Sequence, residues 1–253
     1  MTKRKKFLYI GIVLVLYVLI IAFPTYLFTQ DVLVLRIVEL SLRTAYLIFI
    51  ALFAFFTKLG QTYTGKTRYS MLFLLLPIFF IAFINIFYLG VVRGSKFEFV
   101  VNPFTDVING LGFISLIITA VEEEVLFRYL IQKNLTFAHK LVRIFVAAAI
   151  FAITHVFVML YSGLGRINPI NLLDVVFKFG IGVILGFLYE YTNNLAAPIT
   201  FSIIYSLSNN MLYKVTLSDN PHWSYYLTVG LFALGGAIYL SLFYFVMIKR
   251  EER

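Results

Sequence analysis

Cysteine is absent from the 253-residue chain, and Asp, Glu, Lys and Arg together make up only 13% of it. Without cysteine there is no disulfide, no thiolate metal site and no cysteine nucleophile. The scarcity of charge is matched by 61% hydrophobic residues, against about 45–50% in soluble domains. Because these residues are spread along the whole length, we predict one integral membrane domain over residues 1–253 rather than a soluble domain on a single anchor.

The hydrophobic residues fall into eight runs, most of them about 20 residues long, the length that a membrane-spanning helix needs. We therefore predict an all-α, polytopic bundle of about eight transmembrane helices, with no internal repeat or low-complexity tract. The expected helices cover residues 7–28, 37–56, 71–92, 107–133, 141–160, 172–191, 196–213 and 223–248. Gly180, Gly182 and Gly186 give the sixth of them a small-residue face that permits close helix packing.

A net charge of +9 could indicate nucleic acid, but the basic residues lie mostly at the ends of the apolar runs. That placement favours anionic membrane lipid as the partner and no nucleic acid. Most of these residues fall on one side when the N-terminus is cytoplasmic, so we predict a multi-pass cell-membrane protein with both termini in the cytoplasm. Its size and its Phe, Ile and Lys content favour a bacterial source.

Four charges interrupt the fourth run: Glu122, Glu123, Glu124 and Arg128. One Asp, Lys or Arg at the centre of a membrane helix costs about 2.5–3.5 kcal/mol on insertion scales, so three adjacent carboxylates need a reason. Glu124 and Arg128 are four residues apart, on one helical face, where the arginine can neutralise the carboxylate. Glu123 then points about 100° away. We interpret Glu122 as water-facing or helix-pairing rather than catalytic. Glu39 and Arg43 are read as a helix-end ion pair.

Polar groups on three helices reach one level of the membrane. At 1.5 Å per residue, Glu123 lies about 15 Å and His155 about 18 Å from the cytoplasmic ends of their runs. Ser202 and Ser206 lie about 12 and 18 Å into the seventh run by the same rise. His155 alone would be interpreted as a buried histidine bonded to a neighbouring helix, but its matching depth favours a joint site with Glu123.

A carboxylate and an imidazole at one depth are the groups needed to activate a water molecule. Glu123, Glu124 and His155 could also bind zinc, but zinc sites usually use three well-placed ligands, often two of them imidazoles, so no metal or other cofactor is predicted. A proton-coupled transporter would use intramembrane carboxylates too. The lack of an internal repeat argues against that class.

The segment Glu123-Glu124-Val-Leu-Phe-Arg128 resembles the EExxxR signature of the CPBP intramembrane proteases, the family of CAAX-processing and bacteriocin-processing (Abi) enzymes. Residues 151–155 are similar to its FxxxH signature, and the resemblance covers roughly residues 107–213. It implies an eight-helix bundle in which Glu123 is the general base and His155 its partner in peptide-bond hydrolysis. Glu124 and Arg128 would support them.

At its third motif the family has HxxxN or HxxxD, where this chain has Ser202 and Ser206. The family residues bind the carbonyl oxygen that becomes negative in the transition state, and losing one such donor typically costs about 10²–10³ in rate. Tyr205, Asn209 and Asn210 offer further donors. Two functions stay open. One is an endopeptidase acting on a membrane-associated peptide or protein, and the other is a membrane partner-binding, regulatory or bacteriocin-immunity role.

Overall fold

The computed structural model describes residues 3–23, 31–57, 107–135, 139–159 and 169–210, together with positions 235, 239 and 242. In these parts of the chain every regular element is a helix and there is no strand. The all-α class is therefore confirmed. The predicted helix over 71–92 lies outside the described residues, and so does nearly all of the one over 223–248, so the count of eight stays a prediction.

The described helices follow the predicted order. They are α1 (Lys3–Ile21), α2 (Val32–Thr57), α4 (Val107–Glu124), its direct continuation as the π-helix η4 (Val125–Gln132), α5 (Lys140–Met159), α6 (Pro169–Thr192) and α7 (Ala196–Asn210). The predicted fourth helix is thus one continuous rod whose second part is wound more widely. Such π-helical turns are rare and occur frequently at functional sites.

Two of the helix ends differ from the prediction by five residues or more. Helix α2 begins at Val32 rather than at residue 37, because the Asp31 carboxylate accepts hydrogen bonds from the backbone N–H groups of Leu33 (2.8 Å) and Val34 (3.4 Å). Asp31 is therefore a helix cap. Helix α1 ends at Ile21, in agreement with the bias against helical backbone just before a proline, here Pro24. The rest of the predicted helix, residues 24–28, lies outside the described residues.

A tight turn between α6 and α7 confirms the prediction for Asn193 and Asn194. Asn193 has a φ of 48°, and its N–H donates to the Tyr189 carbonyl at 3.0 Å. This is the left-handed residue that commonly ends a helix. The Asn194 side chain then accepts a bond from the Ala196 N–H at 2.9 Å and caps α7.

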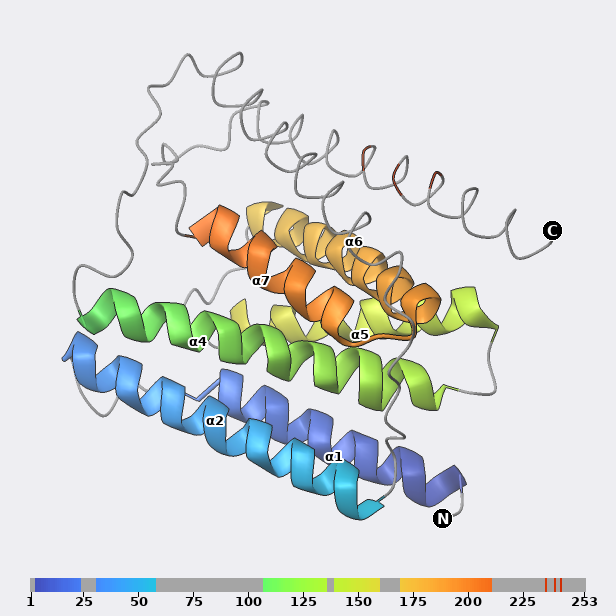
Figure 1. Cartoon of the computed structure of the whole chain (residues 1–253), viewed down its shortest axis with the longest axis horizontal. Helices are drawn as coiled ribbons and strands as arrows, with labels where there is room; N and C mark the ends of the chain where they lie inside the picture. The colour runs from blue at the N-terminus through green and yellow to red at the C-terminus, as the bar shows by residue number, and fades with distance from the viewer. Residues whose placement is uncertain are drawn as a thin grey trace.

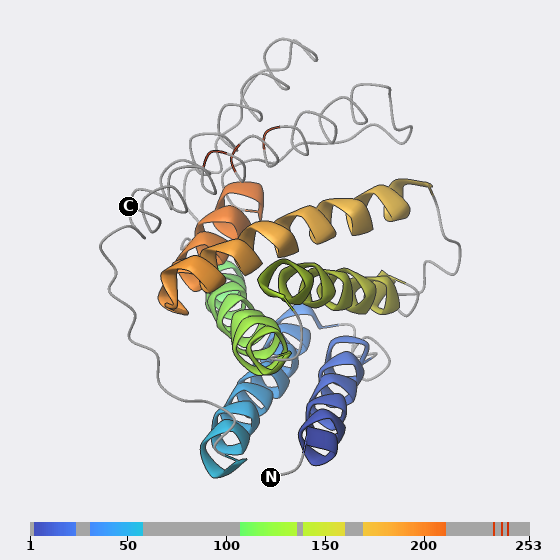
Figure 2. The ribbon, with the colours of Figure 1, turned by 90° about the vertical axis from the view of Figure 1, so that its right-hand side faces the viewer.

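The described helices lie in three layers (Figures 1 and 2). Helices α1 and α2 form one layer, α4 with η4 and α5 the central one, and α6 and α7 the third. The α4–η4 rod therefore packs against α2 on one side and against α7 on the other. It brings the charged segment to the middle of the bundle.

Close packing of α6 on α5 depends on two of the three glycines that were expected to permit it. A Cβ on Gly182 would lie 3.1 Å from Ala148, and one on Gly186 only 2.9 Å from the Ile144 side chain. A Cβ on Gly180 would meet no atom of another element within 4 Å in the part of the chain that the structure describes. The small-residue face is confirmed for Gly182 and Gly186 and wrong for Gly180.

Two of the described helices are long and apolar enough to cross a membrane, α2 and the segment Lys140–Phe157 of α5. Large apolar side chains on the outer surface of α2 are exposed, among them Phe55 (77%) and Phe56 (75%). Such a surface is suited to lipid rather than water.

Candidate functional site

Three consecutive carboxylates leave the α4–η4 rod in three directions, and each meets a different partner. Successive helical residues are turned by about 100°, so Glu122, Glu123 and Glu124 cannot share one neighbour. Glu122 and Glu124 are buried, whereas the Glu123 side chain keeps 14% of its exposure. The middle carboxylate is the one that solvent or a substrate can reach.

Glu124 is held within its own rod. The Arg128 guanidinium donates through Nε to Glu124 Oε2 at 3.1 Å, and both side chains are completely or almost completely buried. The predicted i, i+4 pairing is thus observed. The Arg128 charge also lies over the Phe151 ring, 5.7 Å from its centroid, at a distance where a ring face attracts a cation.

Glu122 pairs two helices. Its Oε2 lies 3.6 Å from Arg43 Nη1 on α2, and its side chain is fully buried. Arg43 also bonds through Nε to Glu39 Oε1 at 3.3 Å, which confirms the predicted pairing. Its predicted place at a helix end is wrong, because α2 already begins at Val32. Of the two roles considered for Glu122, the helix-pairing one is observed and the water-facing one is wrong.

Glu123 and His155 meet across the α4–α5 contact. Glu123 Oε1 lies 3.7 Å from His155 Nε2, so the match in depth predicted from the sequence is observed. That distance is too long for a direct hydrogen bond. One water molecule beside the two atoms can lie about 2.8 Å from each and be bonded by both.

Phe151 fixes how His155 presents its ring. The His155 Nδ1 lies 2.8 Å from the Phe151 carbonyl oxygen, and a carbonyl only accepts, so Nδ1 carries the hydrogen. In the neutral ring Nε2 is then the basic nitrogen, turned toward Glu123. The Phe151 ring adds an edge contact to the imidazole, with centroids 4.5 Å apart.

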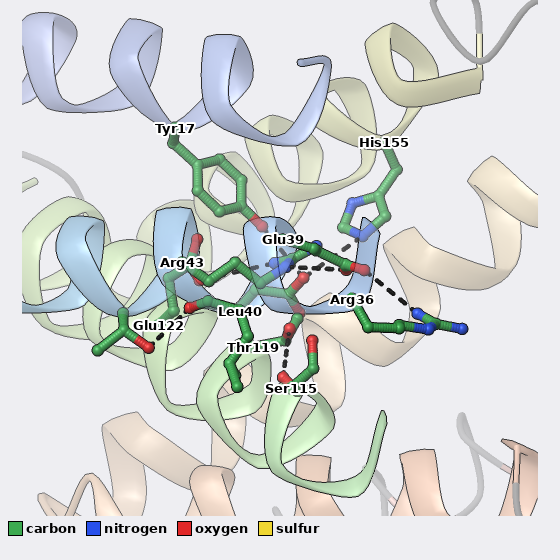
Figure 3. A network of polar contacts seen from close by, with 11 residues as sticks. Tyr17, Arg36, Glu39, Leu40, Arg43, Ser115, Thr119, Glu122 and His155 are labelled. Atoms are coloured by element: carbon green, nitrogen blue, oxygen red, sulfur yellow. Dashed lines mark hydrogen bonds and ion pairs between the residues drawn. The ribbon is translucent and has the colours of Figure 1, made fainter. Parts of the chain in front are cut away.

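A tyrosine from the first helix completes this group of residues. The Tyr17 hydroxyl donates to Glu123 Oε1 at 3.1 Å, the same oxygen that faces His155. Figure 3 shows Tyr17 and His155 approaching one polar network from two different helices, with Arg43 and Glu122 beside them.

Tyr17 and Arg43 are the two residues near the site that sequence reasoning missed. Nothing in the spacing of an apolar run distinguishes one tyrosine from its neighbours. For Arg43 there was a signal, a cation well inside an apolar segment, but its local partner Glu39 accounted for it.

Helix α7 brings the expected third group of residues to the other side of α4. Ser202 is buried (7% exposed) and Ser206 and Tyr205 are partly exposed, with the Tyr205 ring stacked on Phe201. Among the described residues, no hydrogen bond joins either serine hydroxyl to Glu123 or His155. The structure describes the backbone of Asn209 but not its side chain.

No group of three or more His, Asp or Glu side chains is arranged to hold a metal ion within the described ranges. Glu124, one of the three ligands considered from the sequence, is instead bonded to Arg128.

Comparison of the chain with protein-family models identifies a relationship for its central part. Residues 107–208 match the family model described as type II CAAX prenyl endopeptidase Rce1-like. Neither the curated proteins nor the solved structures contain a match to the chain. The matched segment includes the Glu cluster, His155 and Ser202, whereas Tyr17 and Arg43 lie before it.

Proposed function

We propose that the chain is an intramembrane endopeptidase of the CPBP/CAAX protease type, because residues 107–208 match the Rce1-like family model. Its substrate is a peptide bond in a membrane-associated peptide or protein, and the nucleophile is a water molecule activated by Glu123 and His155. The observation that carries the proposal is the 3.7 Å approach of Glu123 Oε1 to His155 Nε2 in a pair that is only 14–15% exposed.

The residues support a simple sequence of steps. Glu123 takes a proton from the water as its oxygen attacks the carbonyl carbon, while His155 orients that water through Nε2. The peptide C–N bond then breaks, and the proton passes to the leaving amine nitrogen. Hydroxyl or amide donors on α7, with Ser202 and Ser206 first among them and Tyr205 and Asn209 beside them, would bind the oxygen that becomes negative.

The setting of this chemistry belongs to the same proposal. We place the protein in a bacterial cell membrane as a multi-pass protein with both termini in the cytoplasm, surrounded by lipid. The apolar outer surface of α2 and the family's membrane-embedded character support the membrane location. The bacterial source and the cytoplasmic termini rest on the composition and on the distribution of basic residues.

Hydrolysis of a fluorogenic prenylated CAAX peptide by the full-length protein in liposomes tests the proposal. Glu123→Gln and His155→Ala should each lower the rate by about 10²–10⁴, the usual contribution of a general acid–base group. The matched control is His139→Ala, since His139 is an exposed histidine just before α5 and its loss should leave the rate unchanged.

Equal rates for the wild type and both site variants would contradict the enzyme proposal. Binding of a membrane partner would then be the better-supported function. That role does not need the histidine and the asparagine or aspartate that the family has where this chain has Ser202 and Ser206. Co-purification of one partner with the wild type and with Glu123→Gln alike would support that alternative.

A further inference from the structure

Tyr17 is completely buried on α1, outside the segment that matches the family, yet it carries a polar hydroxyl. A buried tyrosine hydroxyl usually has a hydrogen-bond partner. Here the partner is Glu123 Oε1 at 3.1 Å. Because an ionised carboxylate only accepts, the tyrosine is the donor.

The Tyr17 hydroxyl and the His155 ring approach the same oxygen of Glu123. Oε1 lies between the Tyr17 hydroxyl (3.1 Å) and His155 Nε2 (3.7 Å). The Tyr17 hydroxyl therefore restrains the carboxylate so that Oε1 stays beside His155 Nε2, where a water molecule can be bonded by both atoms. A glutamate has three rotatable bonds, and a misplacement of about 1 Å at a reacting group can cost about 10²-fold in rate.

Packing holds the Tyr17 ring in place. Its edge meets the Phe127 ring with centroids 5.5 Å apart, and the Tyr46 ring lies 5.7 Å away on α2. Tyr46 in turn donates its hydroxyl to the Val13 carbonyl at 2.8 Å and so ties α2 to α1. The hydroxyl of Tyr17 is thus presented by a rigid surround, which is what a positioning group requires.

We infer that Tyr17 is a positioning residue for Glu123, so that helix α1 completes the active site from outside the family segment. The inference rests on the proposed function. It assigns the first helix a part in catalysis beyond that of a membrane span.

The test compares Tyr17→Phe with Tyr46→Phe in the liposome assay. Each change removes one hydroxyl from a tyrosine buried in the same aromatic cluster, but only the first removes a contact to Glu123. Losing a hydrogen bond to a charged group corresponds to about a tenfold to hundredfold change. We expect that loss in kcat for Tyr17→Phe with an unchanged KM, and a kcat within about twofold of the wild type for Tyr46→Phe, whose bond is between neutral groups.

A tyrosine fluorinated beside its hydroxyl, introduced at position 17, covers the case in which Tyr17→Phe does not fold. It keeps the ring and the contact but is a stronger donor, which makes Glu123 a weaker base, so kcat should fall while KM is retained. An unchanged kcat in a folded protein would overturn the inference.

The two proposals fail in different ways. If the wild type shows no hydrolysis that depends on Glu123, the proposed function fails and the role of Tyr17 fails with it. If hydrolysis depends on Glu123 but Tyr17→Phe and Tyr46→Phe have the same kcat, only the inference about Tyr17 is overturned.

Discussion

The Glu124–Arg128 and Glu122–Arg43 ion pairs neutralise two carboxylates of the Glu cluster in different ways. The first is local, four residues apart in one rod, with a 3.1 Å hydrogen bond and almost no exposure. The second joins α4 to α2, with atoms 3.6 Å apart and an arginine that is 14% exposed. Both residues of the local pair lie in the segment that matches the family model, whereas in the long-range pair only Glu122 does and Arg43 lies before it.

The two ion pairs depend on different stages of folding. A pair within one helix forms whenever that helix forms, and it depends little on how the bundle packs. A pair between helices exists only after α2 has docked on α4, so it couples the position of the carboxylates to the first layer of the bundle. Removing Arg128 therefore tests an interaction within one helix, and removing Arg43 tests the packing of α2 on α4.

The largest effect is expected for Arg128→Met. It leaves Glu124 as a buried charge with no cation, which costs about 3–5 kcal/mol of unfolding free energy when one partner of a buried pair is removed. Denaturant unfolding in detergent micelles measures it. Arg128→Met/Glu124→Met, which leaves no charge, should recover most of the loss, and a double variant as unstable as the single one would contradict the explanation.

A smaller loss, about 3 kcal/mol at the lower end of the same range, is expected for Arg43→Met. Arg43 is partly exposed and its contact with Glu122 is longer than a hydrogen bond. Arg36→Met is the matched control, since Arg36 also pairs with Glu39 but is 46% exposed, and an exposed pair contributes about 0–1 kcal/mol. Equal unfolding free energies for the two variants would remove the distinction between the long-range pair and a surface pair.

The smallest change in stability is expected at the contact between α5 and α6, which is made by small residues instead of charged ones. Gly186→Ala would bring a methyl group within 2.9 Å of Ile144, and overpacking of this kind costs about 1–3 kcal/mol. Gly180→Ala, with open space around it, should be neutral or stabilise by up to about 1 kcal/mol, because alanine favours helix. Thermal unfolding of both variants compares them, and a Gly180→Ala protein less stable than Gly186→Ala would refute this account.

Much of the central layer was predictable because its determinants are local. The helical spacing of Glu124 and Arg128 predicts their pairing, and the rise per residue predicts that Glu123 and His155 meet. Helix ends were less predictable. Asp31 caps α2 five residues before the expected start at residue 37, since a capping side chain looks like any polar residue before a hydrophobic run.

The sequence by itself determined that the chain is helical and apolar, that three carboxylates stand in one helix, and that a histidine lies at their depth. Only the tertiary structure decided what surrounds each carboxylate. Tyr17 lies 106 residues before Glu123 along the chain, and Arg43 lies 79 residues before Glu122 (122 − 43). No periodicity links side chains on helices that meet only when the bundle packs. The contact of Glu123 with Tyr17 therefore forms only when α1 packs against the bundle. Spacing along one helix does not specify the distances between side chains on different helices.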